Sequence, residues 1–137
     1  SIDMTREEFG RLVLQCRQES GMKMMDICVA LKTLPQAIYR VELGKFNTNT
    51  PFILQLLKAL GYNLTIDGRI FKTEKALAKW MKNRRGERSQ SEVGNAVGLN
   101  YQVIGKIENG QATMMLDTLL SVADLYNSKI SIKQITK

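Results

Sequence analysis

The sequence contains no histidine, which removes the commonest general base and the commonest zinc ligand in proteins. It has no pair of carboxylates spaced for acid–base chemistry, no glycine-rich phosphate loop, and no nucleophile grouped with a base. No apolar run approaches the roughly 18 residues that a membrane-spanning helix needs. We therefore expect a protein that is not an enzyme, holds no metal or cofactor, and has no contact with a membrane.

Cysteine is also scarce, since Cys16 and Cys28 are the only two and both fall in apolar helical patterns. Two buried, reduced thiols are the expected state, which favours a cytoplasmic location; a disulfide between them is the alternative. The opening residues, SIDMTREEFG, are polar and acidic and do not have the basic and then apolar pattern of a secretory signal.

Charge of one sign predominates. The chain has 20 Lys and Arg against 13 Asp and Glu, which gives a net charge of +7. Residues 67–137 carry 12 basic against 7 acidic side chains, and residues 1–66 carry 8 against 6. A basic chain favours polyanionic partners such as nucleic acid, and the excess lies mainly in the second half of the sequence.

The clearest motif is SQSEVGNAVGLNYQVIGKIENG, at residues 89–110. Ser89 with Glu92 forms a capping-box pattern, so a helix should begin at Gln90. Gly98 can end that helix in the left-handed conformation, and Asn100 is a strong N-cap for a second one. The inner face of the second helix is predicted to be Val103, Ile104 and Ile107. Two short helices with a glycine-containing turn form a helix-turn-helix.

A fainter copy, KMMDICVALKTLPQAIYRVELG, lies 66 positions earlier at residues 23–44. The match continues through the following helix and ends at LTI (64–66) and ISI (130–132). Another helix precedes each copy, capped by Thr5 and Thr73 respectively. The alignment slips by one residue between this helix and the next. The series indicates an internal duplication, with a divergent first domain at residues 1–68 and a second domain at residues 69–137.

Short strands are predicted after the helices of each copy. Residues 64–66 alternate in polarity, Asp67-Gly68 is a tight-turn signal, and residues 69–71 can return as a hairpin. The C-terminal KISIKQI is a second alternating stretch. Three arrangements are open: residues 64–66 and 130–132 pair across a pseudo-twofold axis, the strands at 64–71 and 129–135 pair with a partner chain in a homodimer, or an independent hairpin is accompanied by a frayed tail.

The motif at 89–110 resembles the DNA-binding domain of the Cro and lambdoid-repressor (XRE-type) helix-turn-helix family. The matching features are the Ser-Gln opening, the small residue Gly94, the turn glycine Gly98, the inward Ile104, and the Ile107-Glu108-x-Gly110 ending. The resemblance covers nearly all of residues 74–127 and, more weakly, residues 6–61. It implies a mainly α protein of two tandem lambda-repressor-like domains, each with four to five helices and a following strand.

In that family the second helix of the motif lies in the major groove of double-stranded DNA. The resemblance therefore implies base contacts from Tyr101, Gln102 and Lys106, and a phosphate contact from Gln90. Flanking backbone contacts are expected from Asn109, Gln111, Arg88 and the neighbouring Lys82, Arg84 and Arg85. In the first domain the candidates are Gln36, Tyr39 and Arg40, with Lys45 for phosphate. The resemblance also implies ion pairs between Arg84 and Glu108 and between Arg17 and Glu42.

The first copy departs from the family pattern at its caps and its turn. Lys23-Met24 replaces the Ser-Gln opening, and Lys32 replaces the turn glycine. Leu34 takes the N-cap position, unless Thr33 with Gln36 caps one residue earlier. Cys28 takes the small-residue place of Gly94, which indicates close packing. Met22, Met24 and Met25 stand where the family has polar residues, and either fill the core or form an adaptable patch for a protein partner.

These patterns predict a sequence-specific DNA-binding transcriptional regulator, a repressor that acts by occupying an operator. An antitoxin-like autoregulator whose first domain binds a partner protein is one alternative. A protein-interaction module without DNA binding is the other.

Overall fold

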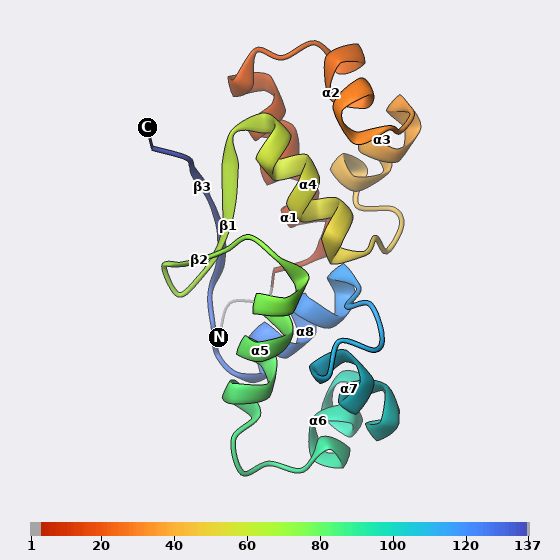
Figure 1. Cartoon of the computed structure of the whole chain (residues 1–137), viewed down its shortest axis with the longest axis vertical. Coiled ribbons are helices and arrows are strands. Elements are labelled where there is room, and N and C mark those ends of the chain that lie inside the picture. The colour runs from red at the N-terminus through yellow and green to blue at the C-terminus, as the bar shows by residue number, and fades with distance from the viewer. Residues whose placement is uncertain (1–3, 137) are drawn as a thin grey trace.

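The computed structural model describes residues 4–136, in which the chain is mainly helical with one small sheet (Figure 1). The helices are α1 (Arg6–Ser20), α2 (Met24–Leu31), α3 (Pro35–Leu43), α4 (Thr50–Leu60), α5 (Glu74–Arg85), α6 (Gln90–Val97), α7 (Tyr101–Glu108) and α8 (Leu116–Leu125). The strands are β1 (Tyr62–Ile66), β2 (Arg69–Phe71) and β3 (Ile130–Gln134). None of these helices is long and apolar enough to cross a bilayer. Residues 1–3 of the polar opening segment, and residue 137, lie outside the described part.

Side-chain caps begin the helices where the sequence predicted them. The hydroxyl oxygens of Thr5, Thr73 and Ser89 each accept a hydrogen bond from the backbone N–H three residues later, at 3.0–3.1 Å. The Asn100 side chain accepts one from the backbone N–H of Gln102 at 2.7 Å. Each cap satisfies a backbone donor that has no partner within the helix, so these starts are fixed by local chemistry.

The predicted hairpin is confirmed. β1 and β2 are antiparallel and are joined by Asp67 and Gly68, whose φ angles are +51° and +82°. Two consecutive residues with positive φ are typical of the type I′ turn, and Asp-Gly is a favoured sequence for it. β3 pairs antiparallel with the other side of β1, which gives the strand order β2-β1-β3. The interpretation as an independent hairpin with a frayed tail is therefore wrong.

The register of β1 and β3 brings together residues that are 66 positions apart. Thr65 faces Ser131, and on either side of this pair Leu64 faces Ile132 and Ile66 faces Ile130. If each residue is replaced by its counterpart 66 positions away, the Leu64–Ile132 pair becomes the Ile66–Ile130 pair, and the Thr65–Ser131 pair stays the same. A pseudo-twofold axis through the Thr65–Ser131 pair requires this pattern. Within this chain both edges of β1 are therefore paired, and the predicted homodimer stays a prediction.

A second contact between the halves follows the same rule. Asn49 and Met115, also 66 positions apart, form an antiparallel bridge. The backbone N–H of Thr50 donates to the Met114 carbonyl at 2.9 Å, and that of Leu116 donates to the Thr48 carbonyl at 2.7 Å. If each residue is replaced by its counterpart 66 positions away, one of these hydrogen bonds becomes the other. In Figure 1 the α2–α3 and α6–α7 pairs lie at opposite ends of the molecule, on the side away from the sheet.

Buried apolar side chains from both halves form one continuous cluster. On α5, the apolar side chains of Leu77, Trp80 and Met81 recur at helical spacing and are all buried. The prediction for Val103 is wrong: this side chain is 36% exposed, whereas Ile104 is fully buried. Neighbouring helical residues point about 100° apart, so Val103 turns away from the core when Ile104 points into it.

Candidate nucleic-acid interface

The α6–α7 pair has a tightly built turn. Gly98 ends α6 with a φ of +76°. The N–H of Leu99 donates to the Gly94 carbonyl at 2.8 Å. A Cβ atom added at Gly94 would come within 2.4 Å of the Leu99 carbonyl oxygen, so the turn passes too close for any side chain there. Gly94 is therefore needed for close approach, and Gly98 for its left-handed conformation.

The outward face of α7 carries the three predicted base-reading residues. Tyr101 is 51% exposed, and Gln102 and Lys106 are exposed as well. Ile104 and Ile107 on the inner face are buried and hold the helix against the core. Glutamine can pair with adenine through two hydrogen bonds, and lysine can donate to the guanine acceptors. This short helix thus presents hydrogen-bond donors and acceptors suited to base edges, and its inner face holds it against the core.

Gln90 lies differently from the other candidates. Its side chain is half-buried, and its Nε2 donates to the Glu108 carboxylate at 3.1 Å. The same amide packs on Gly105, where an added Cβ atom would lie 3.1 Å from Gln90 Oε1. In this conformation Gln90 links the start of α6 to the end of α7, and its phosphate contact stays a prediction.

The ion pair of Glu108 is formed by Arg85, so the prediction of Arg84 is wrong. Arg85 Nε and Nη2 donate to the buried carboxylate at 2.8 and 3.1 Å, and this bonding raises the pKa of Arg85. Arg84 instead donates to the backbone carbonyl of Tyr126. The predicted pair of Arg17 with Glu42 is confirmed, at 2.5 and 3.0 Å.

The error at Arg84 comes from the spacing of the first helix in each half. The two caps, Thr5 and Thr73, are 68 positions apart, and so are Arg17 and Arg85. The helix-turn-helix pairs are 66 positions apart, so the alignment slips by two residues and not by the one residue predicted. The two-residue slip arises because α5 is three residues shorter than α1, whereas the segment before the next helix is one residue longer, with residues 86–89 in place of residues 21–23.

Basic side chains on α5 lie across a groove from the residues that follow α7. A groove of about 490 Å³ is lined by Lys75, Lys79 and Lys82 on one side and by Asn109 and Gly110 on the other, with Glu74 and Glu108 also lining it. Lys82 and Asn109 were expected near the DNA backbone, whereas Lys75 and Lys79 were missed. Their spacing of four and three residues was the available signal, because it puts all three lysines on one face of a helix.

The remaining predicted contacts of the second half are exposed. Arg88, Asn109 and Gln111 all lie at the surface. Arg88 lies over the Tyr126 ring, with its guanidinium carbon 5.5 Å from the ring centre. Tyr126 is itself buried, and burial raises the pKa of its hydroxyl, so the ring stays neutral beneath the arginine. Arg88 is thus held near the start of α6 by a cation–π contact.

The α2–α3 pair repeats the geometry without the caps. Lys32 adopts the left-handed conformation, with a φ of +54°, where the second half has Gly98. The N-caps are Lys23 and Leu34, and neither side chain makes a capping hydrogen bond, so the alternative cap at Thr33 is wrong. Cys28 is buried, in agreement with close packing at the place of Gly94.

The predicted contact residues on this half are exposed: Gln36, Tyr39, Arg40 and Lys45. Two of them are engaged by neighbours. The Arg17 guanidinium carbon lies 5.8 Å from the Tyr39 ring centre, and that of Arg40 lies 5.0 Å from the centre of the Phe46 ring. α3 therefore presents fewer free polar groups than α7.

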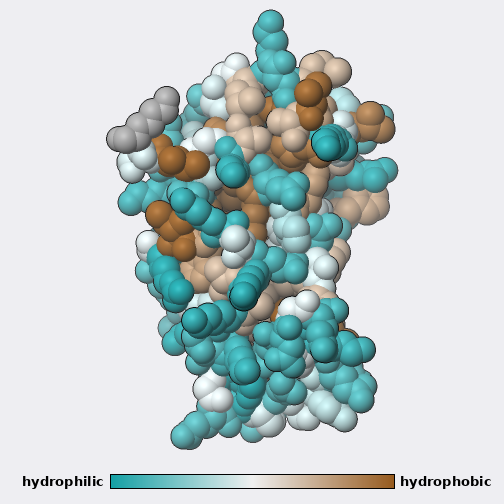
Figure 2. Space-filling model, in the orientation of Figure 1, coloured by the Kyte–Doolittle hydropathy of each residue, from teal (hydrophilic) through white to brown (hydrophobic). Residues whose placement is uncertain are grey.

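An apolar face, made up of Met25, Val29 and Leu34, covers the outside of this pair. Their exposed fractions are 64%, 73% and 69%. Figure 2 shows hydrophobic side chains at the end of the molecule that holds α2 and α3, and a hydrophilic surface at the end that holds α6 and α7. The residues 66 positions later are Ser91, Asn95 and Asn100. Met22 and Met24 are half-buried against the core, so only Met25 belongs to an exposed patch.

Comparison of the chain with models of known protein families, with curated proteins and with solved structures gave no match. Among residues 4–136, no three His, Cys, Asp or Glu side chains gather as metal ligands. Cys16 and Cys28 are both free and buried, and burial raises the pKa of Cys16 to about 11.

Proposed function

We propose that the protein is a sequence-specific double-stranded DNA-binding regulator of transcription, with α7 as its reading helix. The observation that carries this proposal is the capped, tightly turned α6–α7 pair, which presents Tyr101, Gln102 and Lys106 outward. Gln102 has the chemistry to read adenine and Lys106 to read guanine. The lysines of α5 lie beside the end of the same helix and supply charge for the phosphate backbone. Regulation is steric, through occupation of an operator.

We also propose that the chain consists of two lambda-repressor-like units that act as a single-chain equivalent of a dimer. The pairing of β1 with β3 and of Asn49 with Met115 supports this proposal, because each contact stays the same when the equivalent residues of the two halves are exchanged. Two helix-turn-helix pairs on the same side of the molecule suit successive major grooves, about 34 Å apart. Since α3 and α7 carry different residues, the two half-sites differ in sequence.

The salt dependence of duplex binding tests this proposal against an interaction module without DNA binding. Removing one phosphate-binding side chain should lower the slope of log affinity against log salt by about one. We expect that decrease for Lys79→Met, which lies in the α5 groove, and none for the control Lys133→Met on β3, since the sheet lies on the side away from the helix-turn-helix pairs. Equal slopes for both variants, or an affinity that barely responds to salt, would contradict DNA binding through this surface.

The apolar face favours a second candidate, an autoregulator whose first half also holds a partner protein. Exposed apolar side chains concentrate at Met25, Val29 and Leu34, where the second half has polar residues. The test replaces these three residues by the polar residues found 66 positions later, in one variant with Met25→Ser, Val29→Asn and Leu34→Asn. A stoichiometric polypeptide that co-purifies with the natural chain and is lost with this variant, while duplex binding is kept, supports the second candidate. Purification without a partner rejects it.

A further inference from the structure

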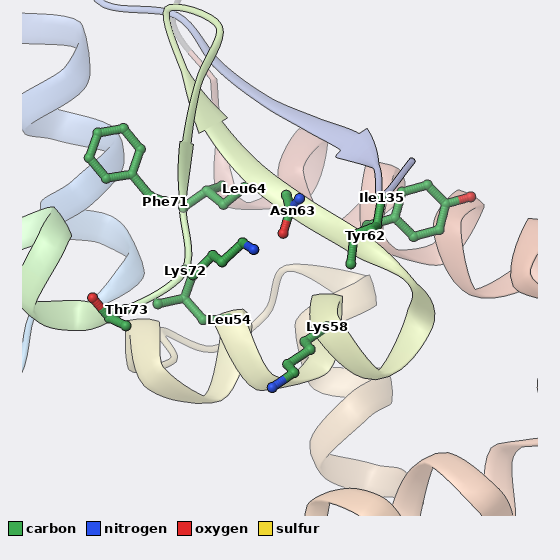
Figure 3. Close-up of a pocket in the computed structure, with 9 residues that line it drawn as sticks. All are labelled: Leu54, Lys58, Tyr62, Asn63, Leu64, Phe71, Lys72, Thr73 and Ile135. Carbon is green, nitrogen blue, oxygen red and sulfur yellow. The ribbon is translucent and has the colours of Figure 1, made fainter. Parts of the chain in front are cut away.

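A cavity of about 260 Å³ opens between α4, β1 and the segment that joins β2 to α5 (Figure 3). It lies among elements from both halves, and none of the proposed DNA contacts lines it. Its apolar wall includes Leu54, Leu64 and Phe71, whose side chains are almost entirely withdrawn from solvent. The volume is below that of a typical drug-sized pocket, so only a compact ligand fits.

The polar side of the cavity is built by the β1–β2 register. Leu64 faces Phe71, so the next residues outward, Asn63 and Lys72, lie opposite each other. Figure 3 shows the amide of Asn63 and the ammonium of Lys72 close together in the hollow, with Lys58 on α4 at its rim. The residues that line the cavity include these two lysines and no carboxylate. An amide and an ammonium beside an apolar wall suit an oxyanion attached to an apolar body.

We infer that this cavity binds a small organic anion with one carboxylate or phosphate group and a compact apolar body. The anionic group lies between Asn63 and Lys72. Glu74 borders the neighbouring hollow beyond Thr73, so repulsion keeps the anion away from that end. The apolar body rests on Leu54 and Leu64. This site goes beyond the proposed function, because it requires no DNA.

The single tryptophan reports on the cavity wall. Phe71 lines the cavity, and its ring, which Figure 3 shows turned away from Asn63 and Lys72, lies edge-on to Trp80 with the ring centres 6.3 Å apart. A ligand that displaces Phe71 changes the surroundings of Trp80, whose fluorescence can be followed without a label. Backbone amide shifts measured by NMR on the full chain give the location independently.

The test uses phenylacetate and phenyl phosphate as anionic probes and phenylacetamide as their neutral counterpart. We expect saturable binding of at least one anion at millimolar concentration, with the largest amide shifts at Lys58, Asn63 and Lys72. Comparison of the two anions identifies the preferred head group. The neutral amide should bind about tenfold more weakly, since it lacks the charge that strengthens the hydrogen bond to Lys72.

Lys72→Met should weaken binding of the anion by about tenfold. Lys75→Met is the matched control, because both lysines are exposed and carry the same charge, but Lys75, three residues away, does not line the cavity. Its effect should stay within about twofold, because a screened charge that does not contact the ligand contributes little. Equal effects of the two substitutions, equal binding of the neutral amide, shifts centred elsewhere, or no saturation would each overturn the site.

Discussion

Removal of Arg85 is a substitution from which we expect a large loss of stability. The Glu108 side chain is 1% exposed and accepts hydrogen bonds from Arg85 at 2.8 and 3.1 Å and from Gln90 at 3.1 Å. Arg85→Met leaves this carboxylate buried with only the Gln90 amide as its side-chain partner. Breaking a buried ion pair from one side typically costs about 3–5 kcal/mol, which is a large part of the usual free energy of unfolding.

Urea unfolding, followed by circular dichroism and by Trp80 fluorescence, measures this loss. With a loss of about 3 kcal/mol and an m-value of about 1–3 kcal/mol per M, the midpoint should fall by about 1–3 M. Arg84→Met is the matched control on the preceding residue, where a hydrogen bond to the Tyr126 carbonyl and a cation–π contact with the Tyr126 ring are lost, at a cost of about 1–2 kcal/mol. Replacing both partners, as Arg85→Met with Glu108→Leu, should recover part of the loss because no unpaired charge remains.

The reasoning is refuted if Arg84→Met destabilises the chain as much as Arg85→Met does. It is also refuted if the double substitution is less stable than Arg85→Met alone, because the loss would then not come from an unpaired carboxylate.

Three further predictions concern the backbone and its local contacts. Gly94→Ala should cost about 1–3 kcal/mol in urea unfolding, since its Cβ would lie 2.4 Å from the Leu99 carbonyl oxygen; a change under half a kcal/mol argues against the close approach. Lys32→Gly should stabilise the chain by about 1 kcal/mol, because φ is +54° there, and a loss of stability would contradict that conformation. Asp67 accepts a hydrogen bond from the Lys129 N–H at 2.8 Å, which holds the pKa of Asp67 below its ordinary value of 3.8. Its stabilisation is therefore present above pH 3.8 and lost as pH falls through the lowered pKa, so the advantage of the natural chain over Asp67→Asn should shrink in acid; an advantage independent of pH rejects this.

The parts of the fold that local chemistry determines could be predicted from the sequence. The caps at Thr5, Thr73, Ser89 and Asn100 and the turn at Asp67 each depend on a few neighbouring residues, and all have the predicted geometry. The 66-residue repeat also indicated how β1 and β3 could pair, because equivalent positions of the two halves can face each other across a pseudo-twofold axis. It left open whether the partner strand belonged to the same chain.

The contacts between elements were harder to predict. Arg84 and Arg85 are neighbouring basic residues at the end of one helix, and only the packing angle of α5 on α7 decides which of them reaches Glu108. The hydrogen bond of Gln90 to Glu108, 18 residues away, has no local signature in the sequence, and the phosphate contact of Gln90 stays a prediction. The lysines of α5 join the candidate interface only when α7 is packed beside them.

The measurement that tests the central claim most directly is selection from a randomised duplex pool, followed by binding of the winning sequences. We expect a defined motif, with Gln102→Ala costing about 1–3 kcal/mol and relaxing one base position. Gln18→Ala, an exposed glutamine on α1, should leave affinity and motif unchanged. Selection without a motif, with weak and uniform binding across sequences, would contradict the claim that α7 reads DNA.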